Sequence, residues 1–400
     1  MKILVLTSVY KDYSFGNIDS STNIVNSFAR EWVNQGHEVI VIHNSHCYPK
    51  IIHFIPRKIK KKIATFLSFQ IADYALVKKK EYDDLGVKVY RLPIKKYKPH
   101  HSPSDKQIKS QVNKIIELLS KNNFIPDVIT GHWASPQMEI IYYLKDIYKC
   151  RTAVVLHGTG YISDLKFDVK KYLEKIDILG CRSLSQSKQV KEILKLNYLP
   201  FVCYSGIPDE YLRKYKLNLD KFNNINKWKI VYVGRLVAYK NIDIIVKALS
   251  SIKKYDWEFN VIGEGSEKNN LQKLSKDLHC EDRIHFFGKI SRDEVMKVMN
   301  DMHIFAMVST DEVFGLSYLE AMASSCITIA SKNGGVDGII IDKKNGFLCE
   351  QENVDDLNKR LNYIFGLKNS KLKKISRNGY DDVHNYSDSN EAKIYLANLI

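Results

Sequence analysis

Short apolar runs of the kind that form buried β-strands alternate with helix-length amphipathic segments along almost the whole chain. Such alternation is typical of a parallel sheet covered by helices. The pattern starts again after residue 226, so we expect an α/β protein with two doubly wound domains. The expected strands lie at residues 2–9, 38–43, 87–92, 127–132, 152–157, 229–234, 258–263, 283–288, 303–308 and 326–330, and the expected helices include residues 20–35, 267–278, 355–364, 371–377 and 390–399.

A polar stretch separates the two halves. Residues 213–227 are rich in Asn and Lys and show no apolar periodicity, so we expect them to form the linker. Ligands of doubly wound sheets bind outside the carboxyl ends of the strands. The cleft between two such domains is therefore the expected site, and residues that follow strands are the candidates for chemistry.

The composition excludes disorder and a membrane span. Of the 400 residues 44% are hydrophobic, enough for a sizeable core. The longest uninterrupted apolar run has five residues, far short of the roughly 20 needed to cross a bilayer. The chain enters a strand-like run directly after Met1 and Lys2, so we expect no export signal. The seven scattered cysteines include no CxxC pair, which favours reduced thiols in a cytoplasm.

Positive charge is concentrated in the first half. The net charge is +16, and residues 1–210 hold 32 Lys or Arg against 20 Asp or Glu. Residues 57–98 alone hold thirteen basic residues against four acidic ones. Such a surface attracts anionic lipids, nucleic acid or a phosphorylated substrate, and charge does not choose among them. Apolar residues at helical spacing over 59–71 can form a helix on an anionic membrane, or one that packs its apolar face in the core.

One segment of the second half carries two basic residues after a strand. In VYVGRLVAYKN (residues 231–241), Gly234 and Arg235 end an apolar run and Lys240 stands where a helix is expected to begin. A fixed guanidinium and a mobile ammonium beside helix amides can neutralise a diphosphate leaving group. The alternative is an ordinary exposed Arg and Lys in a loop.

Two carboxylates flank the start of another expected helix in STDEVFGLSYLEAMA (residues 309–323). Glu312 precedes the helix, Phe314 and Gly315 begin it, and Glu320 lies inside it, about 80° around the axis from Glu312. Glu312 can bind sugar hydroxyls, and Glu320 can accept the two hydroxyls of a ribose. A negatively charged helix start and a solvated Glu are the alternative.

Two histidines follow neighbouring strands of the first half. His157 in LHGTG precedes two glycines, and His132 in TGHWASP ends the strand before it. Ring nitrogens at a strand's carboxyl end can reach a ligand, although a histidine bonded to its own loop fits the sequence equally. Gly16, after the first strand, can bring backbone close to a phosphate.

Other chemistries find little support in the sequence. His43, His46, Cys47 and His53 can in principle ligate a metal, but their spacing fits no closed zinc pattern. No Asp-x-Asp, Walker loop, serine nucleophile elbow or HExxH motif occurs, and no GxGxxG follows the first strand. We therefore expect no metal and no nicotinamide cofactor.

Together and in this order, the motifs resemble those of the retaining GT-B glycosyltransferases of family 4, the glycosyl transferases group 1. GRLVAYKN resembles the family's GRL-x(n)-K element, and EVFGLSYLE its E-x7-E signature. VIGEGSE resembles the GxG turn after the next strand, HG at His157 resembles a first-domain histidine near the transferred sugar, and GHWASP resembles a run seen in many members.

The resemblance implies two Rossmann-like domains and a metal-independent sugar transfer from a nucleoside-diphosphate sugar with retention of configuration. It implies that Arg235 and Lys240 bind the diphosphate, Glu312 the donor sugar and Glu320 the ribose, with His157 near the transferred sugar. The further candidates for donor binding are Gly16, Gly234, Gly263, Gly265, Phe314, Gly315 and Leu316. Residues 1–206 are then the acceptor domain, 207–380 the nucleotide-sugar domain, and 381–400 a helix that packs back on the first domain.

Some positions differ from the family's usual pattern. Ser325 and Ile327 stand where a Gly and a Pro are usual, and Asp337 and Gly338 stand where Pro and Glu usually follow two glycines. These departures bear on the donor sugar and on the level of activity, and they leave the diphosphate and ribose candidates intact.

The sequence thus predicts a hexosyl- or N-acetylhexosaminyltransferase, with UDP as the nucleotide by resemblance alone. The basic residues 57–98 fit a lipid-linked glycan acceptor at the inner face of a bacterial membrane, in surface-polysaccharide assembly, and we expect no nucleic-acid partner. The alternatives are a GT-B sugar-nucleotide epimerase and a non-catalytic basic protein that binds membranes or nucleic acid.

Overall fold

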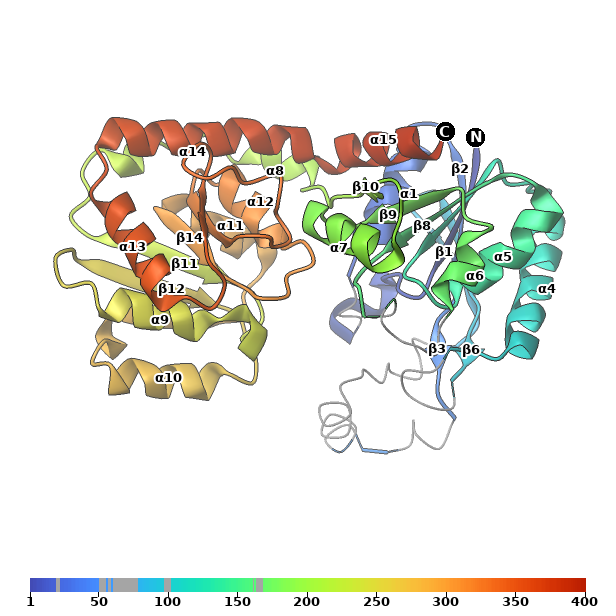
Figure 1. Ribbon diagram of the computed structural model, residues 1–400, viewed down its shortest axis with the longest axis horizontal. Helices are drawn as coiled ribbons and strands as arrows, with labels where there is room; N and C mark the ends of the chain where they lie inside the picture. The colour runs from blue at the N-terminus through green and yellow to red at the C-terminus, as the bar shows by residue number, and fades with distance from the viewer. Residues whose placement is uncertain are drawn as a thin grey trace. The chain divides into compact units, whose positions relative to one another are not determined.

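The computed structural model describes residues 1–18, 22–49, 55–56, 59, 78–96, 102–160, 162 and 168–400. This part of the chain forms two compact units, each with its own sheet (Figure 1). The first unit comprises residues 1–182, 186–203 and 391–400, and the second comprises residues 183–185 and 204–390. The predicted class, α/β with two sheet-based domains, is confirmed.

The first unit is built on an eight-stranded sheet with the order β10-β9-β8-β7-β1-β2-β5-β4. The neighbouring strands are parallel except for β4, which runs antiparallel to β5 at the edge. A short parallel pair, β3 with β6, extends the strands β2 and β5. The strands are β1 (Lys2–Thr7), β2 (Glu38–His43), β3 (His46–Cys47), β4 (Lys80–Asp84), β5 (Val87–Arg91), β6 (Ile94–Lys95), β7 (Val128–His132), β8 (Arg151–Leu156), β9 (Ile178–Cys181) and β10 (Phe201–Val202).

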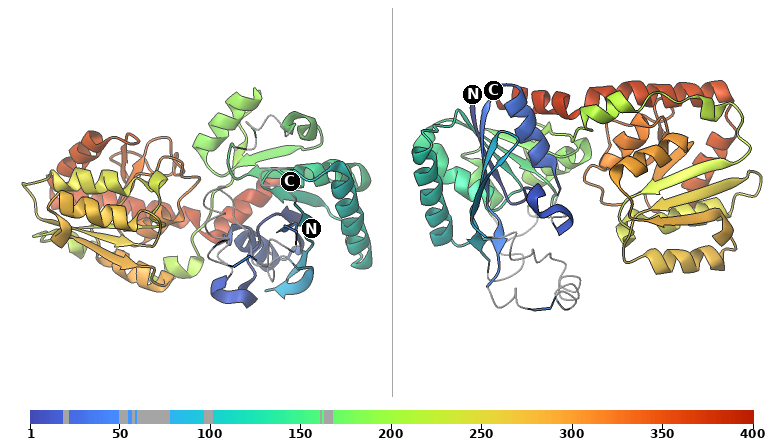
Figure 2. Two further views of the ribbon diagram at one scale, coloured as in Figure 1. Left: turned by 90° about the horizontal axis from the view of Figure 1, so that it is seen from below. Right: turned by 180° about the vertical axis from the view of Figure 1, so that it is seen from behind.

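Helices cover both faces of this sheet (Figure 2). Successive residues of a strand point to opposite faces, so Leu4 and Leu6 of β1 enter one core and Ile3 and Val5 enter the other. The first core lies under α4 (Asp105–Lys121) and α5 (Gln137–Tyr148), and the second under α1 (Ile24–Asn34) and α15 (Asp388–Leu399). The remaining helices here are η1 (Tyr13–Ile18), α6 (Val169–Leu173) and α7 (Leu184–Leu194).

The second unit has a fully parallel six-stranded sheet with the order β13-β12-β11-β14-β15-β16. Its strands are β11 (Trp228–Val233), β12 (Trp257–Ile262), β13 (Ile284–Gly288), β14 (Ile304–Met307), β15 (Ile327–Ser331) and β16 (Phe347–Cys349). Its helices are α8 (Asp209–Lys214), η3 (Asp220–Phe222), η4 (Ala238–Lys240), α9 (Ile242–Ser250), α10 (Lys268–Asp277), η5 (Glu281–Arg283), α11 (Arg292–Asp301), α12 (Leu316–Ala323), α13 (Val354–Phe365), α14 (Asn369–Val383) and η6 (His384–Tyr386).

The stretch that we predicted as the linker, residues 213–227, is part of the second unit, so that prediction is wrong. Tyr215 and Phe222 within it are buried in the core of that unit. Single aromatic anchors on short elements leave no periodicity in the sequence, which is why the segment resembles a linker. The chain instead passes between the units after Cys203 and again within α15, whose residues from Glu391 onward belong to the first unit.

The basic segment that we predicted to form a surface helix lies largely outside the described residues, since 57–58, 60–77 and 97–98 are not among them. Among the helices that the structure does describe, none has the length and apolar character to cross a membrane.

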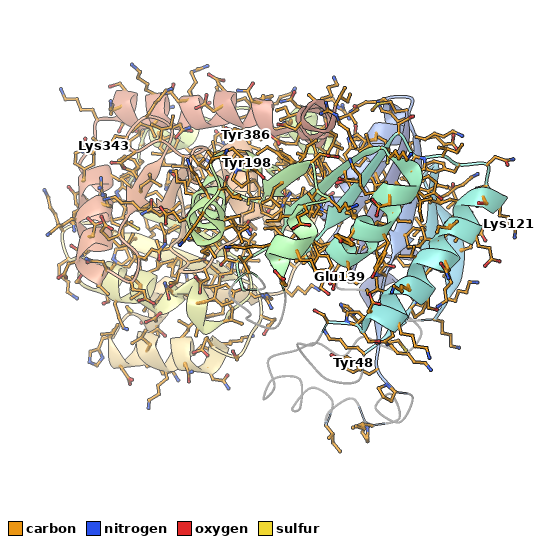
Figure 3. All side chains as sticks on the ribbon, turned by 45° about the vertical axis from the view of Figure 1, so that its right-hand side comes forward. Tyr48, Lys121, Glu139, Tyr198, Lys343 and Tyr386 are labelled. Atoms are coloured by element: carbon orange, nitrogen blue, oxygen red, sulfur yellow. The ribbon has the colours of Figure 1, made fainter. Side chains whose placement is uncertain are left out.

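A buried carboxyl group lies on α5, where Glu139 is only 3% exposed (Figure 3). The Ser135 hydroxyl donates to its Oε1 at 2.6 Å. Burial raises the pKa of Glu139 to about 7, against a partial opposing effect of the Ser135 hydrogen bond. The folded protein therefore holds a proton on this carboxyl that the unfolded chain releases at lower pH.

We expect the substitution Glu139→Gln to change how stability depends on pH. A raised pKa in the folded state means that stability is lost as pH rises from roughly 4.3 to about 7, by about 3 kcal/mol. The variant should match the wild type near pH 4.5 and exceed it above pH 7, as measured by urea unfolding. Glu117→Gln, at an exposed position of α4, is the control. A gain of equal size at both pH values would contradict the assignment.

Candidate functional site

The carboxyl end of β11 presents the first of the predicted residues. The Tyr232 hydroxyl donates to the Arg235 carbonyl at 2.9 Å and holds the loop that follows the strand. The Arg235 guanidinium is exposed, and its Nη2 donates to the Tyr239 hydroxyl at 2.7 Å. Arg235 is thus a positive group on a fixed backbone at the edge where ligands of such sheets bind.

Lys240 and Glu312, predicted separately, form an ion pair. The Lys240 ammonium at the end of η4 donates to Oε2 of Glu312, and the two side chains are only 10% and 15% exposed. Nδ2 of the Asn241 side chain donates to the Val308 carbonyl at 3.0 Å and so connects η4 to the end of β14. The strands β11 and β14 are neighbours, and this adjacency brings the two residues together.

The pair also affects a neighbouring phenol. Burial, and next the negative charge of Glu312, raise the pKa of Tyr232 far above its ordinary value. The Tyr232 hydroxyl therefore stays protonated and donates a hydrogen bond to the Arg235 carbonyl. Glu312 is thus a largely buried negative group that pairs with the Lys240 ammonium.

Gly263 and Gly265 let two loops pack backbone against backbone. The Gly234 amide donates to the Ile262 carbonyl and the Leu236 amide to the Glu264 carbonyl, both at 3.0 Å. A Cβ at Gly263 would lie 1.8 Å from the Gly234 carbonyl oxygen, and one at Gly265 would lie 2.0 Å from that of Leu236. The GxG turn thus continues the β11–β12 pairing past the strands and supports the loop that carries Arg235.

The N-terminus of α12 lies beyond Gly315. Gly315 has φ +83°, and a Cβ there would lie 2.7 Å from the Tyr318 ring. No side chain among the described residues caps the helix, and the Tyr318 amide donates to the Gly315 carbonyl at 3.0 Å, so the amides of Leu316 and Ser317 are the first-turn donors left for a ligand. Phe314 is 4% exposed, its ring centre lies 5.6 Å from that of Tyr204, and its main chain lies so close to Gly335 that a Cβ there would come within 2.5 Å of it.

Glu320 forms an ion pair that the sequence analysis missed. Nε of Arg292 donates to its Oε1 at 2.6 Å, and Glu320 is only 6% exposed. The Arg292 guanidinium lies 5.1 Å from the Tyr211 ring centre. A basic residue at the first position of a helix, α11, opposes the helix dipole, and this was the one signal in the sequence.

In the first unit, His157 and His132 form a hydrogen-bonded pair. Nδ1 of His132 lies 2.9 Å from Nε2 of His157, and Trp133 stacks on the His157 ring with centroids 3.9 Å apart. The Tyr395 hydroxyl on α15 lies 3.3 Å from Nε2 of His132 and 2.6 Å from Oγ1 of Thr130. Tyr395 is 263 residues from His132 in the sequence, and no local pattern indicates this contact.

Both histidines are neutral at ordinary pH. Burial, and next the Arg182 guanidinium, lower the pKa of His132 to about 3. The same two causes, followed by His132, lower the pKa of His157 well below its ordinary value. One proton therefore lies between the two rings, and Nδ1 of His157 is the nitrogen that this contact leaves for a ligand.

The remaining candidates are Gly16 and the possible metal ligands. Gly16 lies in η1, after β1. Nε2 of His43 lies 3.2 Å from the Ser8 carbonyl oxygen, and His53 lies outside the described residues. Over the described part of the chain, no three His, Cys, Asp or Glu side chains are grouped to hold a metal ion.

Most of the second unit matches a known protein family. Residues 216–382 match the family model described as Glycosyl transferases group 1. The chain is 30% identical over 260 residues to an uncharacterized glycosyltransferase of Methanocaldococcus jannaschii, covering 63% of this chain and 69% of that protein. It is 27% identical over 249 residues to the N-acetyl-alpha-D-glucosaminyl L-malate synthase of Bacillus anthracis, covering 60% of this chain and 64% of that protein.

Solved structures share the whole fold. A glycosyltransferase from Rickettsia africae superposes with a TM-score of 0.69 at 18% identity, covering 99% of this chain and 97% of that one. Anabaena Alr3699/HepE in complex with UDP gives 0.70 at 16% identity, covering 100% and 99%. These likenesses confirm the predicted GT-B fold.

We expect Gly265→Ala to destabilise the second unit, because its Cβ would enter the Leu236 carbonyl oxygen. Overpacking of this kind typically lowers the free energy of unfolding by about 1–3 kcal/mol. Chemical denaturation monitored by tryptophan fluorescence measures it. Gly366→Ala is the matched control, because there the nearest atom is at 3.5 Å. Equal stability of the two variants would contradict a packing role for Gly265.

Proposed function

Because the chain belongs to the glycosyl transferases group 1 family, we propose that its second unit binds a nucleoside-diphosphate sugar and that the enzyme transfers this sugar with retention of configuration. The observation that carries the proposal is the Lys240–Glu312 ion pair, together with Tyr239, whose hydroxyl accepts from Arg235 and whose ring centre lies 5.4 Å from Nζ of Lys240. Together these groups offer what a diphosphate-linked sugar needs, two cations and a carboxylate.

The ion pair gives the proposed donor site its mechanism. A diphosphate replaces Glu312 as the counter-ion of Lys240, and the freed carboxylate accepts hydroxyls of the donor sugar. Arg235, Lys240 and the amides at the start of α12 then stabilise the negative charge that grows on the leaving diphosphate. Because this positive charge comes from the chain itself, we propose that transfer needs no metal ion.

The ribose is proposed to bind at Glu320. Arg292 holds Oε1 of this carboxylate, so its orientation is set before a ligand arrives. Two hydroxyls of a ribose can then donate to the carboxylate. Gly234, Gly263, Gly265, Gly315 and Leu316 contribute through the backbone that they position.

UDP is the nucleotide that we propose. The Anabaena protein of the same fold has been solved with UDP and with UDP-glucose. Names of two relatives, the Bacillus anthracis synthase and a Staphylococcus aureus poly(ribitol-phosphate) alpha-N-acetylglucosaminyltransferase, refer to N-acetylglucosamine. These relatives support a hexosyl- or N-acetylhexosaminyltransferase.

The acceptor is proposed to bind the first unit. There His157, neutral and fixed by His132 and Trp133, presents a ring nitrogen suited to a sugar hydroxyl. The basic residues 57–98 support a lipid-linked glycan as acceptor and a peripheral position on the inner face of a bacterial membrane, in surface-polysaccharide synthesis.

The test is release of nucleoside diphosphate from a panel of UDP-, GDP- and ADP-sugars, with and without bacterial lipid extract. One donor should be used only when lipid is added, and EDTA should leave the rate unchanged. Arg235→Ala should lower kcat/KM by about a hundredfold or more, since it removes a charge that stabilises the leaving group. Glu320→Ala should weaken donor binding.

Arg377→Ala, at an exposed position of α14, is the control and should retain activity. Conversion of a donor in the absence of any acceptor would indicate a sugar-nucleotide epimerase instead of a transferase. No release from any donor, together with no binding of UDP, would overturn the proposed enzyme.

A further inference from the structure

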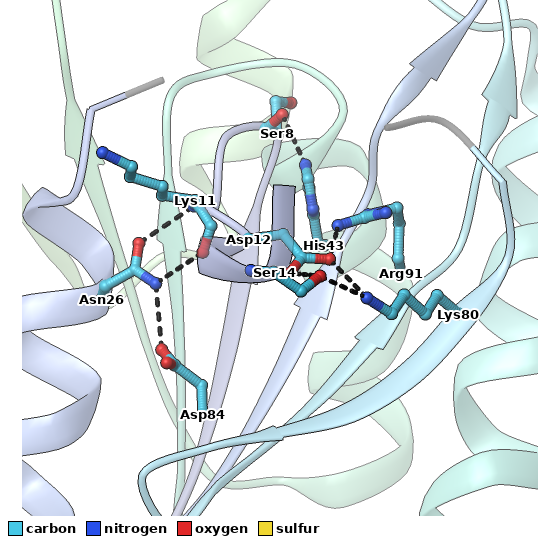
Figure 4. A network of polar contacts seen from close by, with 9 residues as sticks. All are labelled: Ser8, Lys11, Asp12, Ser14, Asn26, His43, Lys80, Asp84 and Arg91. Carbon is cyan, nitrogen blue, oxygen red and sulfur yellow. Dashed lines mark hydrogen bonds and ion pairs between the residues drawn. The ribbon is translucent and has the colours of Figure 1, made fainter. Parts of the chain in front are cut away.

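A second cluster of charged residues lies in the first unit, at the edge of its sheet (Figure 4). Val87, Val89 and Arg91 alternate along β5, and the two valines enter the core under α1. Arg91 therefore extends the same face at the carboxyl end of the strand. Lys80 of β4 is the register partner of Arg91, so both cations lie side by side on this face.

Arg91 has fewer partners than a buried guanidinium requires. It is 1% exposed, and its Nη2 donates to Oδ2 of Asp12 at 2.8 Å. Its Nε and Nη1 are buried and have no hydrogen-bond partner among the described residues. Buried donors are almost always paired, and a buried charge with open donors is costly.

The carboxylate of this cluster is already shared. Oδ2 of Asp12 also accepts from Nζ of Lys80 at 2.8 Å, and Ser14 donates to its Oδ1. Burial would raise the pKa of Asp12, but the hydrogen bonds from Lys80, Ser14 and Arg91 outweigh it and lower the pKa to about 2. Among the described residues of this cluster, two cations thus share one carboxylate, so Lys80, Arg91 and Asp12 together carry a net positive charge.

Asp84, the carboxylate on the same face of β4 as Lys80 and Tyr82, does not balance the positive charge of Lys80 and Arg91. Asp84 accepts from Nη2 of Arg30 at 2.5 Å and from the Tyr10 hydroxyl at 2.8 Å. The Asn26 amide donates to it as well, at 3.0 Å. Asp84 is therefore engaged by its own set of donors.

The Tyr82 hydroxyl is a third buried donor at this end of the sheet. It forms no hydrogen bond of good geometry within the described part of the chain, although the Arg91 guanidinium is close enough to oppose the larger effect of burial, which raises the pKa of this hydroxyl. Nζ of Lys80 lies 4.8 Å from the Tyr82 ring centre, and Cζ of Arg91 lies 5.7 Å from it. Lys80, Tyr82 and Arg91 thus gather donors at one end of the sheet, and the side chain of Lys80 is 33% exposed to solvent.

We propose that Arg91, Lys80 and Tyr82 form an oxyanion-binding subsite that takes a phosphate or carboxylate group of the acceptor. An oxyanion supplies the negative charge and the acceptor atoms that these donors lack, while Asp12 keeps hold of Nη2 and orients the guanidinium. The position at the carboxyl end of β5 is where ligands of such sheets bind. Its assignment to the acceptor rests on the proposed transfer reaction, because the donor's diphosphate is proposed to bind the second unit.

Titration calorimetry with inorganic phosphate, and separately with succinate, tests the subsite. Saturating UDP occupies the donor site, and KCl holds the ionic strength constant. The wild type should bind at least one of the two anions, and Arg91→Gln should weaken that binding at least about tenfold. Tyr82→Phe and Lys80→Gln should weaken it too. Lys88→Gln, at an exposed position of the same strand, should leave it unchanged.

The outcomes separate this subsite from the donor site. UDP affinity, measured in the same samples, should be equal in the wild type and in Arg91→Gln, which also shows that the variant is folded. If Arg91→Gln does not fold, Tyr82→Phe and Lys80→Gln decide the question. Absence of phosphate and succinate binding to the wild type, or binding that all three variants keep, would overturn the subsite whether or not UDP binds.

Discussion

The chemistry that we propose for the second unit depends on the ion pair between Lys240 and Glu312. A nearly buried ammonium needs a negative partner, and in the protein alone Glu312 provides it. A ligand that brings its own negative charge can take over this role and release the carboxylate. The surrounding structure keeps both groups in register, through the Asn241 bond to β14 and the glycine loops that extend the β11–β12 pairing. The backbone of the proposed site is thus held in place by these contacts, while Lys240 can exchange Glu312 for a negatively charged ligand.

We propose that each unit uses the carboxyl end of its parallel strands for a different task. In the second unit the functional side chains are charged and paired, Lys240 with Glu312 and Arg292 with Glu320. In the first unit the histidine pair is neutral, since burial and Arg182 disfavour its protonation. A neutral His157 can accept or donate a hydrogen bond to a sugar without attracting the diphosphate. This difference in charge is consistent with the proposed binding of the diphosphate to the second unit.

The sequence predicted the residues at strand ends and missed those whose position depends on distant packing. Arg235, Lys240 and Glu312 follow strands of one parallel sheet, and the carboxyl ends of such strands meet at one edge, so the sequence predicted a common site but not the ion pair between Lys240 and Glu312. Arg292 and Tyr395 reach their partners from other elements, across 28 and 263 residues, and no periodicity records such contacts. The linker prediction failed because isolated aromatic residues can anchor a polar segment. The GxG glycines, predicted to bind the donor, also have a packing role that the sequence did not indicate, because they contact the neighbouring loop's backbone.

The most direct test of the central claim compares two nucleotides on one variant. Dissociation constants for UDP and for uridine monophosphate are measured on the wild type and on Lys240→Met, which keeps most of the length of the side chain and removes its charge. If Lys240 exchanges Glu312 for the donor's diphosphate, UDP should lose at least about tenfold in affinity, or 1.4 kcal/mol, while uridine monophosphate changes much less. An equal loss for both nucleotides, or none for UDP, would contradict the account.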